Sequence, residues 1–114
     1  MALSRKELGE KRYASWKDEY QSKLRTADEL AAMIESSDII LEPGGINIPH
    51  DFHVALAKRV GELKNVTICL GLALKFYDFM QPQYKENIHI ETPFVGPVER
   101  MLIEWGTASY VPQH

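Results

Sequence analysis

The 114-residue sequence has one cysteine, no long apolar run and no excess of positive charge. A single cysteine, Cys69, cannot form an internal disulfide, and we expect a reducing, cytoplasmic location. The most apolar uncharged stretch, residues 66–74, is well short of the ~20 residues that a bilayer requires, so no membrane span is expected. Thirteen Lys and Arg against sixteen Asp and Glu give a net charge of -3, which does not favour nucleic-acid binding.

The composition is that of a folded domain. The sequence is 45% hydrophobic and 25% charged, which is ordinary for globular proteins and too apolar for a disordered chain. Its length corresponds to one domain or part of one. The first residues carry charges but no apolar segment typical of a secretory signal, so none is expected.

Residues 1–24 are predicted to form an amphipathic helix. Its apolar residues recur at intervals close to one face of a helix, and they are Leu8, Tyr13, Trp16, Tyr20 and Leu24. Two interpretations remain open for this aromatic stripe. It packs either on its own domain or on another domain or subunit.

Residues 25–114 are predicted to form an α/β domain. Thr26 and Glu29 make a capping-box pattern that opens a helix from 27 to about 36. Periodicity then predicts strands at 39–41, 66–70, 87–91 and 108–111 and helices at 51–63 and 97–105. Residues 71–86 are ambiguous between a longer strand and a loop, with a short helix at 76–80 and a loop at 81–83. This alternation predicts an open, mainly parallel sheet with flanking helices.

The loop after the first predicted strand is the first candidate ligand site. In open α/β sheets, ligands bind beyond the carboxyl ends of the strands. Residues 42–49 supply two glycines there, followed by a helix whose free N–H groups favour an anion. The loop has neither a dinucleotide-binding nor a P-loop pattern, so the residues alone favour a plain tight turn.

Titratable residues give no complete catalytic set. His50 and His53 lie three residues apart at a helix start, but no third ligand has suitable spacing, so we interpret them as surface or cap residues and expect no metal. Asp51 is expected to cap the helix. Glu42 flanks the glycine loop and Glu91 ends a strand near the expected ligand edge. An isolated carboxylate there could act as a base, but a solvated charge or a helix cap is the more common role. Cys69 is interpreted as a buried thiol without a base.

Several ordered segments carry a family resemblance. They are Lys23–Asp38, Gly45 to Pro49, Ala55–Arg59, Glu62–Val66, Phe94–Arg100 and Trp105–Pro112. Together they cover about residues 20–114 and resemble the acetyl-CoA hydrolase/transferase family, which includes the 4-hydroxybutyrate and butyrate:acetate CoA-transferases. The resemblance implies the N-terminal α/β domain of such a protein at residues 25–114, with a second, similar catalytic half absent.

The resemblance also implies a reaction. Family members move CoA from a small acyl-CoA to a carboxylate, or hydrolyse acyl-CoA, through a mixed anhydride and a glutamyl-CoA thioester. The reacting glutamate belongs to the second half, so no residue of this sequence is assigned as catalytic. Coenzyme A or acyl-CoA is then a substrate, with no covalently bound cofactor.

The resemblance assigns two groups of site residues. The substrate-facing loop corresponds to Gly44, Gly45, Ile46 and Asn47, and a second family signature corresponds to Gly96 and Arg100. The sequence departs from the family pattern at Asn47, where glycine is common, and at residues 91–93, where a smaller polar pair is expected.

The implied partners are an acyl-CoA, a small carboxylate and the C-terminal catalytic half or a partner subunit, in a homo-oligomer. Two alternatives remain open. The chain could be a non-catalytic assembly or binding module, a split subunit that acts through the aromatic stripe. It could also be an unrelated nucleotide-binding α/β domain.

Overall fold

A parallel sheet organises the chain. The computed structural model describes residues 6–7 and 12–113. Its described strands are β1 (Ile39–Leu41), β2 (Val66–Cys69), β3 (Ile88–Thr92) and β4 (Ala108–Tyr110). They form one sheet in the order β1-β2-β3-β4, with each neighbouring pair parallel. The predicted open parallel α/β fold is therefore confirmed, with strand ends that differ from the predicted ones by at most one residue.

The helices are shorter than the apolar periodicity predicts. They are α2 (Trp16–Lys23), α3 (Ala27–Ala32), α4 (His50–Ala57) and α5 (Pro97–Glu104). Thr26 and Glu29 form the predicted capping box at the start of α3. The Arg59 guanidinium donates hydrogen bonds to the carbonyl oxygens of Ala31 and Ile34, which ends α3 four residues before the predicted boundary. The predicted helix 51–63 is also wrong as one element, because α4 ends at Ala57 and a 3-10 turn, η2 (Val60–Glu62), follows.

The ambiguous segment 71–86 is mostly irregular. It contains two single 3-10 turns, η3 (Asp78–Met80) and η4 (Pro82–Tyr84), in place of the predicted short helix and loop. Phe79 and Met80 in η3 are fully buried. The segment therefore contributes side chains to the core although its periodicity is weak.

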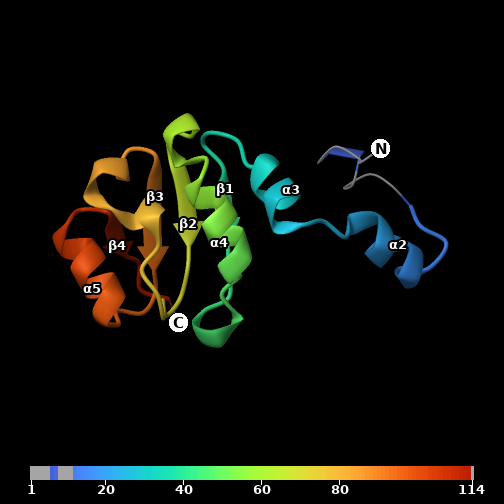
Figure 1. The fold of residues 1–114 in the computed structure, drawn as a ribbon. Helices are drawn as coiled ribbons and strands as arrows, with labels where there is room; N and C mark the ends of the chain where they lie inside the picture. The colour runs from blue at the N-terminus through green and yellow to red at the C-terminus, as the bar shows by residue number, and fades with distance from the viewer. Residues whose placement is uncertain (1–5, 8–11, 114) are drawn as a thin grey trace.

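The described residues cover one face of the sheet. That face carries Val66, Ile68, Ile88, Ile90 and Ala108, which pack with Phe52, Ala55 and Leu56 of α4 and Leu102 of α5. Figure 1 shows α4 and α5 lying over the sheet. On the opposite face the side chains of Ile39 and Leu41 are 71% and 79% exposed. We call this second face the open face.

The N-terminal segment stands apart from the sheet. The predicted continuous helix 1–24 is wrong at residues 12–15, which are not helical, because Ser15 takes an extended conformation and caps α2 by accepting from the Asp18 N–H. No described residue of α2 is buried, and Leu8 lies outside the described residues. Trp16 is 73% exposed and Tyr20 56% exposed. The rings of Trp16 and Tyr20 are therefore not covered by the rest of the described residues.

Within the part of the chain that the structure describes, no helix combines the length and the apolar character needed to cross a bilayer.

Candidate functional site

The loops after β1 and β2 touch through their backbones. A Cβ atom added to Gly44 would lie 2.9 Å from the Leu72 nitrogen and 3.1 Å from Gly71 Cα. The next residue, Gly45, has a φ of +65° and donates its N–H to the Leu72 carbonyl oxygen at 2.8 Å. Side chains are therefore excluded from Gly44 by close approach and disfavoured at Gly45 by conformation.

A buried carboxylate joins the loops after β2 and β3. Glu99 is fully buried near the start of α5. One of its oxygens accepts from the Ala73 N–H, and the other accepts from the Gly96 N–H at 3.1 Å. A Cβ on Gly96 would lie 2.6 Å from Leu72 Cδ1, so this glycine also allows a close approach. Glu99 was not identified from the sequence, although a Glu at the third position of a helix commonly accepts from the backbone N–H of the N-cap residue in a capping box.

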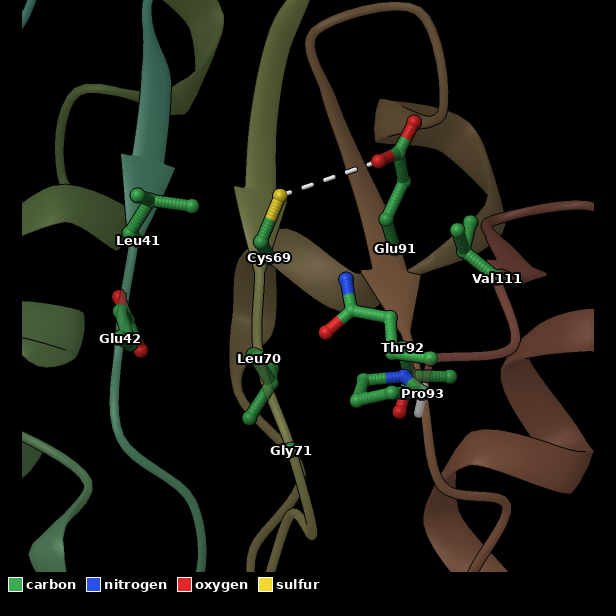
Figure 2. A pocket seen from close by; sticks show the side chains of 10 residues that line it. Leu41, Glu42, Cys69, Leu70, Gly71, Glu91, Thr92, Pro93 and Val111 are labelled. Atoms are coloured by element: carbon green, nitrogen blue, oxygen red, sulfur yellow. Dashed lines mark hydrogen bonds between the residues drawn. The ribbon is translucent and has the colours of Figure 1, made fainter.

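A pocket of about 160 Å³ lies at the carboxyl ends of the strands. Figure 2 shows its side chains arranged around the ends of three neighbouring strands. Its lining residues are Leu41, Glu42, Cys69, Leu70, Gly71, Glu91, Thr92, Pro93, Val111 and Gln113. Most of them are apolar or small, and the lining contains no lysine or arginine.

Cys69 is a pocket residue and not a fully buried thiol. It is half-buried on the open face, and its Sγ lies 3.8 Å from a Glu91 carboxylate oxygen. Burial, followed by the negative charge of Glu91, raises the pKa of the Cys69 thiol. The prediction of a buried hydrophobic cysteine was wrong because alternate residues of β2 face a side of the sheet that the described residues leave uncovered.

Glu42 and His53 form a buried pair. His53 Nε2 lies 2.7 Å from both Glu42 carboxylate oxygens, and the His53 and Glu42 side chains are 0% and 2% exposed, respectively. The interpretation of His53 as a surface or cap residue, and of Glu42 as a solvated charge, was therefore wrong. The pair forms because Glu42 at the end of β1 and His53 in α4 both face the covered side of the sheet.

Aromatic rings enclose this pair. The His53 ring meets Tyr77 and Phe79 edge to face, with centroids 4.5 Å and 5.3 Å away. Its Nδ1 has no hydrogen-bond partner among the described residues. Burial, followed by the Glu42 charge, raises the pKa of Tyr77, whose hydroxyl lies 3.1 Å from Nδ1 of the exposed His50. The described histidines do not converge on one point, and the described residues contain no cluster of three potential metal ligands.

The remaining sequence-assigned residues have different surroundings. Ile46 is 91% exposed and Asn47 is exposed in the turn η1 (Gly45–Asn47). Arg100 is exposed on α5, whereas Gly44 and Gly96 both approach Leu72. None of the assigned residues lines the pocket itself.

The expected role of Asp51 is wrong. Pro49 is the N-cap residue of α4, and Asp51 lies within its first turn. No side chain caps α4, so the backbone N–H groups of its first turn do not donate to a capping side chain.

Comparison with known proteins gives three relatives in sequence, although no family model matches the chain. The chain is 31% identical over 99 residues to a butyryl-CoA:acetate CoA-transferase of Anaerostipes caccae, covering 86% of this chain and 22% of the relative. It is 48% identical over 56 residues to a probable butyrate:acetyl-CoA coenzyme A-transferase of Syntrophomonas wolfei, covering 49% and 12%. It is 30% identical over 100 residues to a succinyl-CoA:cyclohexane-1-carboxylate CoA transferase of Geobacter metallireducens, covering 88% and 23%.

Solved structures give the same fold. RipA from Yersinia pestis superposes with a TM-score of 0.66 at 24% identity, over 83% of this chain and 25% of that one. A RipA point mutant gives 0.71 at 25% identity, over 82% and 24%. The chain spans about a quarter or less of each of these proteins. In sequence, the chain is thus similar to part of proteins named as butyrate:acetate CoA-transferases, and it shares its fold with part of RipA.

Proposed function

We propose that the chain forms the acyl-CoA-facing part of a CoA-transferase that moves CoA between a small acyl-CoA and a carboxylate. The observation that carries this proposal is the relationship to three proteins that are each named as CoA-transferases. The position of the pocket supports it, because open α/β sheets bind ligands at the carboxyl edge.

The proposed reaction uses a glutamate outside this chain. Its carboxylate attacks the acyl carbonyl, the CoA thiolate leaves, and an acyl-glutamyl anhydride forms. The thiolate then attacks the glutamyl carbonyl and expels the acyl group as a carboxylate, which leaves a glutamyl-CoA thioester. A second carboxylate reverses these steps and departs as the new acyl-CoA.

Three glutamates of this chain are poorly placed to act as the nucleophile, which supports a reacting glutamate outside the chain. Glu42 is 2% exposed and held by His53, and Glu99 is fully buried between two backbone N–H groups. Glu91 reaches the pocket, but it accepts from Cys69 and has no cation in the lining to hold it. None of these three groups combines access with the orientation that a nucleophile needs.

The role that we propose for this chain is therefore to bind the acyl-CoA. The apolar lining from Leu41, Leu70 and Val111 suits a short acyl chain of the butyryl or 4-hydroxybutyryl type. The loop Gly44–Asn47 and the uncapped first turn of α4 present backbone to the carbonyl or phosphate groups of the thioester.

An NMR titration of the ¹⁵N-labelled chain tests the binding step. Butyryl-CoA and CoA are expected to shift the amide signals of Gly44, Gly71 and Gly96, whereas ATP at the same concentration is not. Shifts with ATP alone would instead identify a nucleotide-binding domain. A response to none of these ligands would contradict the proposed site.

A transferase assay tests the external glutamate. The 114-residue chain alone is expected to transfer no CoA from butyryl-CoA to acetate. A fusion of this chain to the remaining sequence of a butyrate:acetyl-CoA transferase is expected to be active. Turnover by the chain alone would show that the reacting group lies within it.

A second candidate function is an assembly module that acts through another chain. The observation that favours it is the exposed aromatic stripe of α2. Its partner is the catalytic half, a separate subunit or a second copy. Sedimentation of the purified chain tests the last of these, and a monomer at all concentrations counts against it.

A further inference from the structure

Two buried side chains join the ends of the glycine loop, defined as residues 43–49 between β1 and α4. Glu42 comes directly before this loop, and His53 lies in the first turn of the helix that follows it. His53 Nε2 is 2.7 Å from both Glu42 carboxylate oxygens. An ionised carboxylate only accepts, so Nε2 donates in this contact. The pair therefore closes the loop by linking residues 11 apart in the sequence.

The backbone holds the base of the same loop. The Gly45 N–H donates to the Leu72 carbonyl oxygen at 2.8 Å, and the His53 N–H donates to the Pro49 carbonyl oxygen at 3.0 Å. Ile46, at the tip, is 91% exposed. A fixed base with an exposed tip is the arrangement of a binding loop whose shape is set before its ligand arrives.

The His53 ring is held in one orientation by the segment after β2. Tyr77 and Phe79 meet the ring edge to face, with centroids 4.5 Å and 5.3 Å away, and the histidine side chain is 0% exposed. Its Nδ1 has no hydrogen-bond partner among the described residues. Nε2 is thus the ring nitrogen with a polar contact, and the aromatic rings direct it at Glu42. All of these contacts join described residues of this one chain.

Stability alone does not account for a polar pair at this position. Taking two ionisable groups out of water is costly, and apolar side chains of similar volume often stabilise a core at least as well. What the pair adds is direction, because a hydrogen bond restricts both the distance and the angle between its partners. Glu42 also lines the pocket at the strand ends, and Gly44 packs its backbone against the loop after β2. The contact therefore sets the path of the chain where the loop borders the pocket.

We propose that His53 is a positioning residue, which through Nε2 and the Glu42 carboxylate holds the glycine loop in the shape that receives the acyl-CoA. In this role His53 does not touch the ligand. The role rests on the proposed acyl-CoA binding, but the order of the loop can be measured with no ligand present.

Two substitutions of His53 separate the donor from the volume of the side chain. Glutamine and methionine have side chains of equal length, and only glutamine carries a donor, as many bonds from Cα as Nε2 of histidine. His53→Gln therefore retains the contact with Glu42, whereas His53→Met removes it. A positioning role for Nε2 predicts that His53→Gln behaves as the unchanged chain does and that His53→Met does not.

A double variant separates positioning from stability. Glu42→Leu combined with His53→Met replaces both partners by apolar side chains, which leaves no buried polar group unpaired and is expected to restore the free energy of unfolding. Urea unfolding measures that recovery. If the pair only stabilised the fold, the loop and its ligand affinity would recover with it. The double variant also removes a negative charge, which by itself would favour an anionic CoA, so a weaker affinity cannot be a charge effect.

Two measurements follow the loop. The first is hydrogen exchange of the Gly45 N–H, which donates within the folded loop. The second is the Kd of butyryl-CoA for the folded chain, from NMR titration. In the double variant we expect exchange to be roughly 10-fold faster and the Kd roughly 10-fold weaker, since the ligand must then order about one residue of backbone. His53→Gln is expected to stay within roughly threefold of the unchanged chain in both.

Three results decide the proposal. A stable double variant with unchanged Gly45 exchange and unchanged Kd would overturn it, because the pair would then serve stability alone. A His53→Gln variant as impaired as His53→Met would overturn the assignment to Nε2. If the unchanged chain binds no butyryl-CoA, the proposed function fails, and Gly45 exchange alone decides whether the pair orders the loop: faster exchange in the double variant supports the pair, and unchanged exchange rejects it.

Discussion

Replacing Gly44 with alanine would force a methyl group to within 2.9 Å of the Leu72 nitrogen. The second contact, at 3.1 Å, is with Gly71 Cα, so neither neighbour is a flexible side chain that could swing aside. Inserting one carbon into such a contact costs about 1–3 kcal/mol, and the rigidity of both neighbours favours the upper part of that range. The loops after β1 and β2 would have to separate.

Gly61→Ala is the control for this variant. A Cβ on Gly61 would meet no atom within 4 Å, and its backbone φ is not in the left-handed region. Both variants restrict the unfolded chain in the same way, which adds about 0.4–1 kcal/mol of stability to each. The difference between them therefore isolates the contact, and we expect Gly44→Ala to be about 2–3 kcal/mol less stable than Gly61→Ala.

Urea unfolding followed by circular dichroism measures both free energies of unfolding. A third variant, Gly71→Ala, tests the shared contact, because its Cβ would lie 3.2 Å from Gly44 Cα. Once one alanine has separated the loops, the second is expected to cost less than it does alone. Equal stability of Gly44→Ala and Gly61→Ala would refute the close packing of the two loops.

Three further predictions concern the charged groups near this edge. Glu99→Gln removes one of two acceptors for buried N–H groups and is expected to cost about 1–3 kcal/mol in the same unfolding assay. His53→Leu leaves the Glu42 carboxylate buried without its partner and is expected to cost about 3–5 kcal/mol, whereas Glu42→Gln retains an acceptor and is expected to cost less. Glu91→Gln removes a negative charge 3.8 Å from the thiol, which lowers the Cys69 pKa, increases the thiolate fraction at pH 8 and is expected to accelerate its reaction with a disulfide reagent roughly fivefold.

Each of these three predictions has a control variant or a result that would contradict it. Glu104→Gln, an exposed change on the same helix as Glu99, is expected to stay within about 0.5 kcal/mol of the unchanged chain. A His53→Leu variant no less stable than Glu42→Gln would contradict the hydrogen-bonded buried pair. A slower thiol reaction in Glu91→Gln would mean that Glu91 activates Cys69 and does not hold its proton.

The positions of the strands were accessible from the sequence because they depend on local apolar runs. Val66 to Leu70 is apolar throughout and is central in the sheet, as its composition predicts. Helix ends were less accessible. The end of α3 depends on Arg59, a residue that is distant in sequence and donates to the carbonyl oxygens of that helix.

The hydrogen-bond partners of the polar side chains could be predicted from the sequence only in part. The Thr26–Glu29 capping box is a local pattern and was predicted correctly. The Glu42–His53 pair joins residues 11 apart across a strand, a glycine loop and a helix, so it depends on the path of that loop. Glu99 contacts Ala73, 26 residues away, and no periodicity reports such a contact. The roles assigned to the Gly44–Asn47 loop stay predictions until ligand binding is measured.

The buried Glu42–His53 pair also restricts how β1 can be placed. Side chains of a strand alternate between the two faces, so a slip of one residue would turn Glu42 toward the open face and Leu41 toward the core. His53 would then be left in the core without its carboxylate, and a buried polar group that loses its hydrogen-bond partner is destabilising. A strand of three residues has little apolar area to define its own register. The pair makes the wrong register costly, and in this way one polar contact fixes the alignment of an edge strand that its own side chains specify weakly.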